Sequence, residues 1–144
     1  MTKLKEIIKA TEQFYNMHWC QSTDTRPFEW NSNWHCEGSV PNHEKPDVYA
    51  LLEENDEVIY IGLGASRIDG HYKEHGIFRR LLAHAITTNK AKGRGHYQPQ
   101  RKWSEVVGVG AVGFHKEFSY LAPALEDYLI GLFSPVLNTI KKRI

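Results

Sequence analysis

The chain has 144 residues, enough for one domain with a hydrophobic core and too few for two full domains. Apolar residues make up 41% and charged residues 24%, as in ordinary globular proteins, and no apolar run is long enough to span a bilayer. The N-terminus lacks the apolar core of a signal peptide, and there are two cysteines, Cys20 and Cys36. We therefore expect a cytoplasmic protein without a disulfide scaffold.

The net charge of +1 is the sum of two unlike halves. Residues 1–57 contain 11 acidic and 5 basic side chains, whereas residues 58–144 contain 6 acidic and 13 basic ones. No acid occurs in 76–103, but seven bases do: Arg79, Arg80, Lys90, Lys92, Arg94, Arg101 and Lys102. This separation favours a polyanionic partner for one face, and a solvated basic loop is the alternative.

The N-terminal third is predicted to be an extension packed on a main domain. Residues 4–19 carry apolar side chains at helical spacing and predict a helix. Residues 20–47 contain three prolines and are predicted to be irregular, with tryptophans as anchors. The spacing of the metal-ligating residues in this part fits no known zinc finger, so we prefer buried cysteines and surface histidines to a zinc site. Those residues are His18, Cys20, His35, Cys36 and His43. The predicted extension covers 1–46 and the main domain 47–144.

Residues 48–62 show the pattern of a β-hairpin. Two apolar runs flank the polar segment 53–57, which has Asn-Asp at its centre. Each run carries one tyrosine, Tyr49 or Tyr60. Because side chains alternate along a strand, both hydroxyls are expected at one end of one sheet face. Two aromatic side chains in such positions are often only core packing, so the pair alone does not establish a site.

A helix and a basic loop are predicted next. After a Gly-rich loop, apolar residues at helical spacing over 77–86 predict a helix, on which Arg80 and His84 stand four positions apart on another stripe. An ordinary surface Arg and His is the alternative. Residues 90–102 are predicted to be a loop, in which His96 and Tyr97 among the bases suit contacts to a sugar–phosphate backbone.

A third strand and a last helix complete the chain. The apolar, β-branched run 105–114 predicts a strand, and it contains a formal G-x-G-x-x-G over 108–113. The helix and acid that a dinucleotide site requires do not follow at the right positions, so the glycines instead indicate close backbone approach or a bulge. Residues 119–133 predict a helix with a leucine stripe. Glu126 lies beside that stripe, where a carboxylate either has a partner or sits at the edge in water.

In this order the motifs resemble those of the GIY-YIG nuclease family. Val48-Tyr49-Ala50 stands at the first triplet of the family, and Tyr60-Ile61-Gly62 matches the second. The resemblance covers about residues 41–140, and the run 38–41 with the basic insertion is most similar to the restriction-endonuclease branch. The family's polar motif positions correspond here to Tyr49, Tyr60, Arg80, His84, Glu126 and Asn138.

The resemblance implies an α/β (α+β) fold, with a three-stranded antiparallel sheet flanked by helices. It also implies hydrolysis of DNA phosphodiesters with one Mg²⁺ or Mn²⁺, with Glu126 as the metal ligand. Arg80 is implied as the clamp on a nonbridging phosphate oxygen. Tyr49 is implied as the base or water-orienting group, Tyr60 as a hydrogen-bond donor to phosphate or water, and His84 as the group that orients a tyrosine or accepts its proton. Asn138 would fix the geometry of Glu126 or of a turn.

The resemblance also bears on partners. The bases expected to contact the DNA backbone are Lys90, Lys92, Arg94, Arg101 and Lys102. Because one small site would need a second copy to cut both strands, a homodimer is consistent with the sequence. A nucleic-acid-binding module without catalysis is the alternative function, and an unrelated small enzyme or interaction domain is a third.

Overall fold

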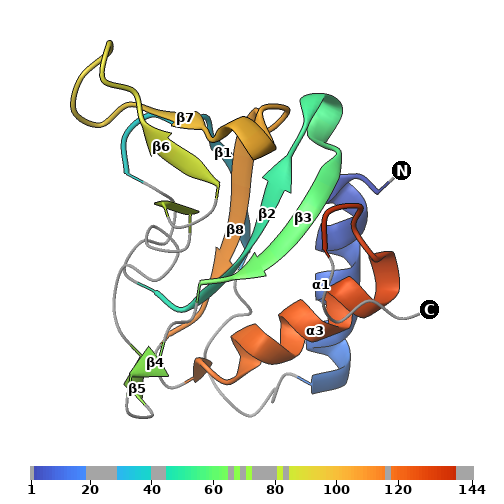
Figure 1. Cartoon of the computed structure of the whole chain (residues 1–144). Coiled ribbons are helices and arrows are strands. Elements are labelled where there is room, and N and C mark those ends of the chain that lie inside the picture. Colours follow the sequence, from blue (N-terminus) through green and yellow to red (C-terminus); the bar gives the residue numbers. More distant parts are fainter. Residues whose placement is uncertain are drawn as a thin grey trace.

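A four-stranded antiparallel sheet, in the order β1-β8-β2-β3, organises the described part of this computed structural model (Figure 1). The structure describes residues 2–18, 29–39, 45–64, 67–68, 71–72, 81–82, 85–115 and 118–138, and of 32–33, 67–68 and 71–72 only the backbone. In chain order, the elements are α1 (Leu4–His18), β1 (Trp30–Trp34), β2 (Asp47–Leu52), the 3-10 turn η1 (Glu54–Asp56), β3 (Val58–Leu63), β4 (Arg67–Ile68), β5 (His71–Tyr72), β6 (Ile86–Thr88), β7 (Tyr97–Pro99), the 3-10 turn η2 (Arg101–Trp103), β8 (Gly108–Gly113) and α3 (Leu121–Phe133). The fold is therefore α+β, as the sequence predicts.

The main sheet has one strand more than the three that the sequence predicts. β2 pairs with β3 in the predicted hairpin and with β8 on its other side. The additional strand is β1, which pairs with β8 so that Trp30 lies opposite Val112. The prediction of an irregular segment over 20–47 is therefore wrong for 30–34. This strand has the sequence WNSNW, which lacks the alternation of apolar and polar residues from which strands are recognised, and its pairing with β8 is a long-range contact.

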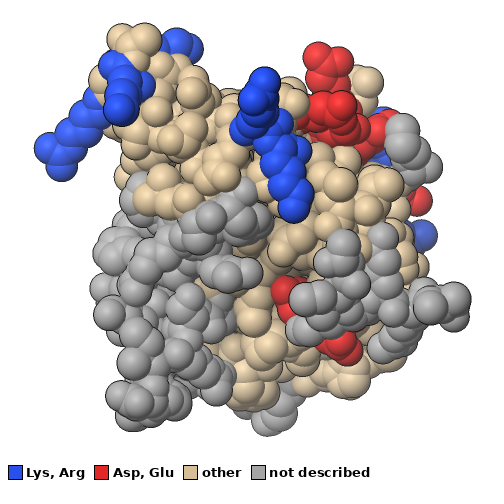
Figure 2. Space-filling view, viewed as in Figure 1, with Lys and Arg blue, Asp and Glu red and all other residues tan. Residues whose placement is uncertain are grey.

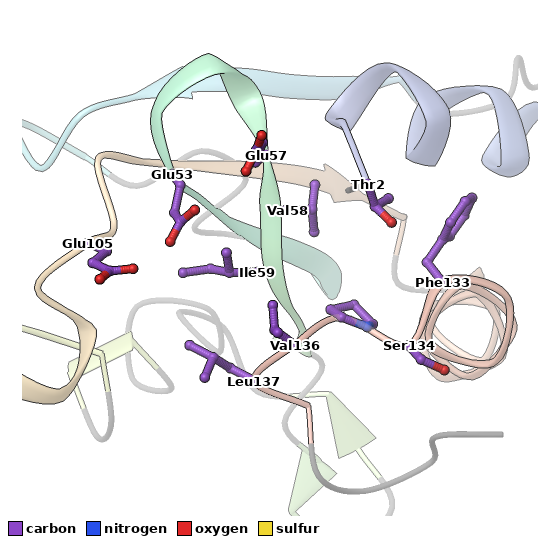
Figure 3. A pocket seen from close by; sticks show the side chains of 11 residues that line it. Thr2, Glu53, Glu57, Val58, Ile59, Glu105, Phe133, Ser134, Val136 and Leu137 are labelled. Carbon is purple, nitrogen blue, oxygen red and sulfur yellow. The ribbon is translucent and has the colours of Figure 1, made fainter. Parts of the chain in front are cut away.

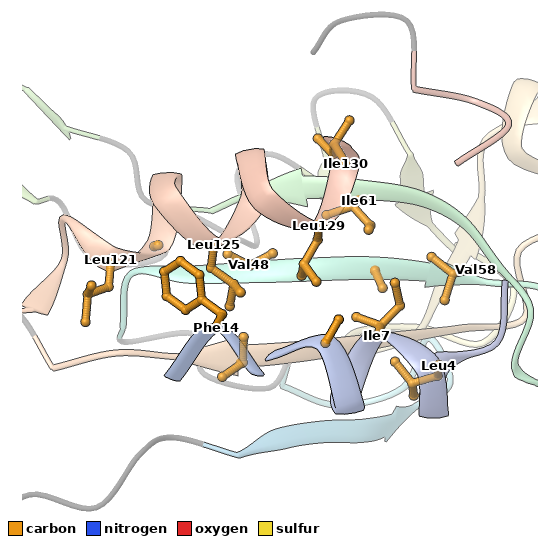
Figure 4. Packing of buried hydrophobic residues seen from close by; sticks show 14 of the residues in the cluster. Leu4, Ile7, Phe14, Val48, Val58, Ile61, Leu121, Leu125, Leu129 and Ile130 are labelled. Atoms are coloured by element: carbon orange, nitrogen blue, oxygen red, sulfur yellow. The ribbon is translucent and has the colours of Figure 1, made fainter. Parts of the chain in front are cut away.

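One face of the sheet packs against both described long helices (Figure 4). Ile7 of α1 and Leu125 of α3 are fully buried against Val48 of β2 and Ile61 of β3. The predicted helices over 4–19 and 119–133 are thereby confirmed, and neither is long and apolar enough to cross a membrane. α1 and β1 lie within the predicted extension, yet they contribute to the same core and the same sheet as the rest of the chain.

The other face of the sheet carries a second, more aromatic cluster. Tyr49 and Leu51 of β2 pack there with Ile59, and Tyr60 lies at the border of the cluster. The register between β2 and β3 shifts after Leu51, so that Ile59 is an extra residue on β3. A bulge of this kind places two successive side chains toward one face, which explains why Ile59 and Tyr60 both join this cluster.

The region after residue 85 differs from the prediction. Ile86 begins β6 instead of ending a helix, and the predicted loop over 90–102 contains β7 and η2. The hairpin of β6 and β7 extends from the upper left of the molecule in Figure 1. Its strands depend on distant partners, because Tyr97 N donates to Cys36 O over 2.8 Å. Local propensity alone does not predict such a short strand.

β8 confirms the predicted third strand and explains one of its glycines. A Cβ atom on Gly108 would lie 3.1 Å from the carbonyl oxygen of Trp34 and 3.2 Å from Nδ1 of His35. β1 therefore approaches this backbone closely, as glycine in a strand indicates. The G-x-G-x-x-G run lies within the strand β8 and opens no helix there.

The segment after α3 covers the outer edge of β3. Ile61 N donates to Asn138 Oδ1 over 2.9 Å, and Asn138 Nδ2 donates to Ile61 O over 2.8 Å. Leu137 N also donates to Ile59 O over 3.0 Å. The buried amide of Asn138 thus supplies the bonds that a further strand would make, and it protects this edge from pairing with another chain.

We expect Asn138→Ala to lower the free energy of unfolding by about 2 kcal/mol, because both peptide groups of Ile61 lose their partner. Urea denaturation measures this change. Asn16→Ala, at an exposed position of α1, is the matched control and should stay within about 0.5 kcal/mol of the parent protein. Equal stability of the two variants would contradict the role given to Asn138.

Candidate active site

Two tyrosines lie together on the aromatic face of the sheet. Tyr49 stands opposite Gly62, and Tyr60 stands opposite Leu51, so the two phenols are diagonal neighbours. Their ring centroids are 6.2 Å apart, and the rings are inclined by 36°. The predicted shared face is therefore confirmed. Tyr49 is fully buried, whereas Tyr60 is only partly buried, so Tyr60 is the phenol of the pair that solvent reaches.

Gly62 provides the space in which Tyr49 lies. A Cβ atom at Gly62 would overlap the ring of Tyr49, 2.8 Å from Cε1 and nearer still to the hydroxyl end. Any larger residue at this position would displace the phenol. This contact gives each residue of the Tyr60-Ile61-Gly62 triplet a separate task. The tyrosine faces the site, the isoleucine enters the core with the helices, and the glycine receives the ring of Tyr49.

Trp103 connects the tyrosine pair to a basic surface. Its ring contacts that of Tyr60 edge to face, with centroids 5.3 Å apart. Lys102 Nζ lies 5.6 Å from the centroid of the Trp103 ring, within the range of a cation–π contact. Lys102 and Arg101 are both exposed on η2. The exposed cations of η2 therefore lie beside the tyrosine pair, separated from Tyr60 by the ring of Trp103.

The charged residues of the described chain are separated on this surface. Figure 2 shows Lys and Arg side chains over the β6–β7 hairpin and η2, Asp and Glu side chains over the β2–β3 turn, and further acidic side chains lower on the same face, over α3. The five bases predicted to contact DNA are all exposed: Lys90, Lys92, Arg94, Arg101 and Lys102. A polyanion is attracted to the first region and repelled by the second.

The remaining predicted site residues are distributed differently. Asn138 is bound to the peptide groups of Ile61, between Tyr60 and Gly62, so it positions β3 and does not face a substrate. Glu126 lies on α3, the helix that packs on the face opposite the tyrosines. The tyrosines and Asn138 are thus grouped on β2 and β3, whereas Glu126 belongs to the helix on the other face of the sheet. Arg80 and His84 lie outside the described residues.

Glu126 is the acid that the sequence analysis assigns to a metal ion. The residue is 8% exposed, so it is largely buried on α3. No group of three or more His, Cys, Asp and Glu residues capable of holding a metal occurs within the described ranges. Mg²⁺ is commonly held by one or two carboxylates together with waters and phosphate oxygens. A single carboxylate therefore fits the predicted Mg²⁺ or Mn²⁺.

Asp47 is a buried acid that the sequence analysis does not single out. It is the first residue of β2, two positions before Tyr49, and strand alternation places it on the face of the tyrosines. It is fully buried, and neither carboxyl oxygen has a hydrogen-bond partner in the described part of the chain. Burial raises the pKa of this carboxyl well above its ordinary value. In sequence, an Asp that precedes an apolar run resembles a turn residue, so only the structure distinguishes it.

An acidic groove lies at the opposite end of the β2–β3 hairpin (Figure 3). It has a volume of about 460 Å³ and joins the apolar side chains of Phe133 and Val136 to three glutamates, Glu53, Glu57 and Glu105. A side-chain hydrogen bond with Glu105 raises the pKa of Glu53, and desolvation and the charges of Glu105 and Glu57 add to this. Such a groove disfavours phosphate, so it is not the surface for a nucleic acid.

Comparison with protein-family models, curated proteins and solved structures finds no match to this chain. The function is therefore inferred from the tyrosine pair, the bases beside it and Glu126.

Gly62→Ala should lower the free energy of unfolding by about 1–3 kcal/mol, because the new methyl group overlaps the ring of Tyr49. A double-mutant cycle with Tyr49→Leu isolates this contact, since leucine leaves room for the methyl group. The cost of Gly62→Ala should be smaller in the Tyr49→Leu background by about 1 kcal/mol or more. Additive effects in thermal or urea denaturation would show that the two residues do not interact.

Asp47→Asn should stabilise the protein at pH 7 and progressively less as the pH falls towards 4. A carboxyl whose pKa is raised in the native state binds its proton more tightly when folded, so its contribution to stability is lost as the pH rises above the unfolded pKa of about 4. Asparagine carries no charge and avoids this loss. Unfolding curves measured between pH 4 and 8 test the trend, with the exposed Glu12→Gln as control. Destabilisation by Asp47→Asn at pH 7 would indicate that the carboxylate is compensated.

Proposed function

We propose that the protein is a metal-dependent DNA endonuclease of the GIY-YIG type. The observation that carries this proposal is the pairing of Tyr49 with Gly62, which brings both motif tyrosines to one face of the β2–β3 hairpin. Gly62 leaves the space that the ring of Tyr49 fills, so the phenol of Tyr49 is held at a fixed position beside that of Tyr60. A nuclease that needs two fixed phenols does require this arrangement.

Phosphodiester hydrolysis needs a positioned water, stabilisation of the charge that develops on the phosphate, and assistance to the leaving group. Tyr60 is partly exposed, so its hydroxyl is the one that meets the water or a phosphate oxygen. Tyr49 is fully buried, and its ring packs against that of Tyr60 and helps to hold it in place. Asn138 holds the peptide groups of Ile61 and thereby keeps Tyr60 at its place on the edge strand.

The charged groups of the mechanism come from the rest of the motif set. Glu126 would hold the divalent cation, which when bound supplies positive charge beside a phosphate oxygen. Arg80 would bind a nonbridging oxygen through its guanidinium, and His84 would orient a tyrosine hydroxyl or accept its proton. Glu126 lies on the face of the sheet that α3 covers, and the tyrosines lie on the other face. These groups can act together only at the edge strand β3, where the two faces of the sheet meet.

DNA is the substrate that the surface charge favours. The exposed bases on the β6–β7 hairpin and η2 lie next to Trp103 and Tyr60. At the other end of β2 and β3, the glutamates of the groove would repel the phosphates of DNA. A duplex would therefore cross the protein from the hairpin towards the tyrosines. Cleavage of both strands by one such small site would require two copies of the chain, each acting on one strand.

Glu126→Gln should abolish cleavage of supercoiled plasmid in the presence of Mg²⁺ and leave DNA affinity within about threefold of the parent, because only the metal-holding charge is removed. Asp127→Asn is the matched control, since it neutralises the adjacent, exposed acid of the same helix. A gel-based nicking assay and fluorescence anisotropy measure the two properties. Retained cleavage in Glu126→Gln would contradict the choice of carboxylate, and binding without cleavage by the parent protein would favour the non-catalytic module.

A further inference from the structure

The β6–β7 hairpin presents a polar face that the core does not use. Ile86 pairs with Pro99 and Thr88 with Tyr97, and these pairs alternate with Thr87 opposite Gln98. Ile86 is buried, and Tyr97 packs on Trp34 with ring centroids 6.0 Å apart. The face with Ile86 and Tyr97 is therefore the inner one. Thr87 and Gln98 are both exposed on the outer face, directly across from each other.

The hairpin is held firmly at its base and along one edge. Gln100 Nε2 donates to Leu82 O over 3.2 Å and to Ile86 O over 3.0 Å, and its backbone N donates to Ala85 O over 2.7 Å. Along β7, Tyr97 N donates to Cys36 O, and Gly38 N donates to Gly95 O, each over 2.8 Å. These bonds, with the antiparallel bridge between Glu37 and His96, pair the segment after β1 with the edge of β7 and leave Thr87 and Gln98 exposed.

The tip of the hairpin is ordered and basic. Lys92 N donates to Asn89 Oδ1 over 3.3 Å, and Gly93 N donates to Asn89 O over 3.1 Å. Gly93 and Gly95 have φ angles of +88° and +84°, which favour glycine, and a Cβ at either would meet nothing within 4 Å. The turn therefore projects into open space, and it carries the exposed side chains of Lys90, Lys92 and Arg94.

We propose that this hairpin is the element with which the protein recognises base sequence, by presenting its outer face to the DNA major groove. The inference rests on the proposed nuclease function and adds its specificity-determining residues, Gln98 and Thr87. The major groove is about 12 Å wide and admits β-strands, which lie about 4.8 Å apart in a sheet. The amide of Gln98 matches the paired acceptor and donor of adenine, and Thr87 offers a hydroxyl and a methyl group to the adjacent base pair.

The basic residues around this face would supply contacts of another kind. Lys90, Lys92 and Arg94 would bind phosphates at the groove wall, which holds the hairpin in position but carries no sequence information. Gln100 connects β7 directly to η2, whose Trp103 contacts Tyr60. Recognition by the hairpin would therefore set the position of the duplex relative to the tyrosines.

The test compares the sequence preference of the parent protein with that of Gln98→Ala and Thr87→Ala. Each full-length protein is incubated with a library of duplexes containing a randomised segment, and bound and cleaved molecules are sequenced. The parent should prefer particular bases at one or two adjacent positions. Each variant should lose about 10- to 100-fold of that discrimination, with affinity for the unselected library unchanged within about threefold. Thermal denaturation should show both variants folded, since the two side chains are exposed.

Lys92→Ala is the matched control from the same hairpin. Removal of a phosphate contact should weaken binding to all duplexes alike and reduce the slope of log affinity against log salt by about 1, without a change in base preference. A parent protein that binds and cuts DNA with no base preference would overturn the inference alone, as would variants that keep the parent's preference. A parent protein that binds no DNA would overturn the proposed function and the inference together.

Discussion

The packing of the Tyr49 ring on Gly62 is the contact on which the candidate site depends. It occurs between directly opposed residues, so it sets the register of β2 against β3 and, through it, the diagonal position of Tyr60. The same register turns Val48 and Ile61 towards α1 and α3. A slip of β3 by one residue would turn its side chains to the other face and send Tyr60 into the helical core, away from Tyr49. One glycine therefore links the hydrophobic core to the site.

The second organising feature is the separation of charge along the sheet. The turn between β2 and β3 collects glutamates around a groove, and the hairpin of β6 and β7 collects lysine and arginine. The tyrosines lie between these regions and are joined to the basic one through Trp103. Among the described residues, the basic region is the one that attracts a polyanion, and Trp103 joins it to Tyr60. This separation of charge would orient a bound DNA duplex on the protein even without contacts to its bases.

Elements with strong periodicity are predicted well from this sequence, and elements that depend on distant partners are not. α1, α3, the hairpin of β2 and β3, and β8 have apolar patterns that span the whole element, so each is recognisable alone. β1 and β7 have no such pattern. Trp30 finds its partner at Val112, and Tyr97 is bonded to Cys36, both far along the chain. Such pairings exist only once the rest of the sheet has formed.

The sequence by itself determined that the bases gather between residues 76 and 103, and strand alternation placed Tyr49 and Tyr60 on one face only for a hairpin in register, which the structure shows. Only the tertiary structure decided that Tyr49 is buried, that Asn138 binds the peptide groups of Ile61, and that Asp47 is enclosed without a partner among the described residues. Burial and hydrogen bonding depend on which elements meet in space. Which elements come into contact depends on the packing of the whole chain, so it cannot be predicted from a local sequence pattern.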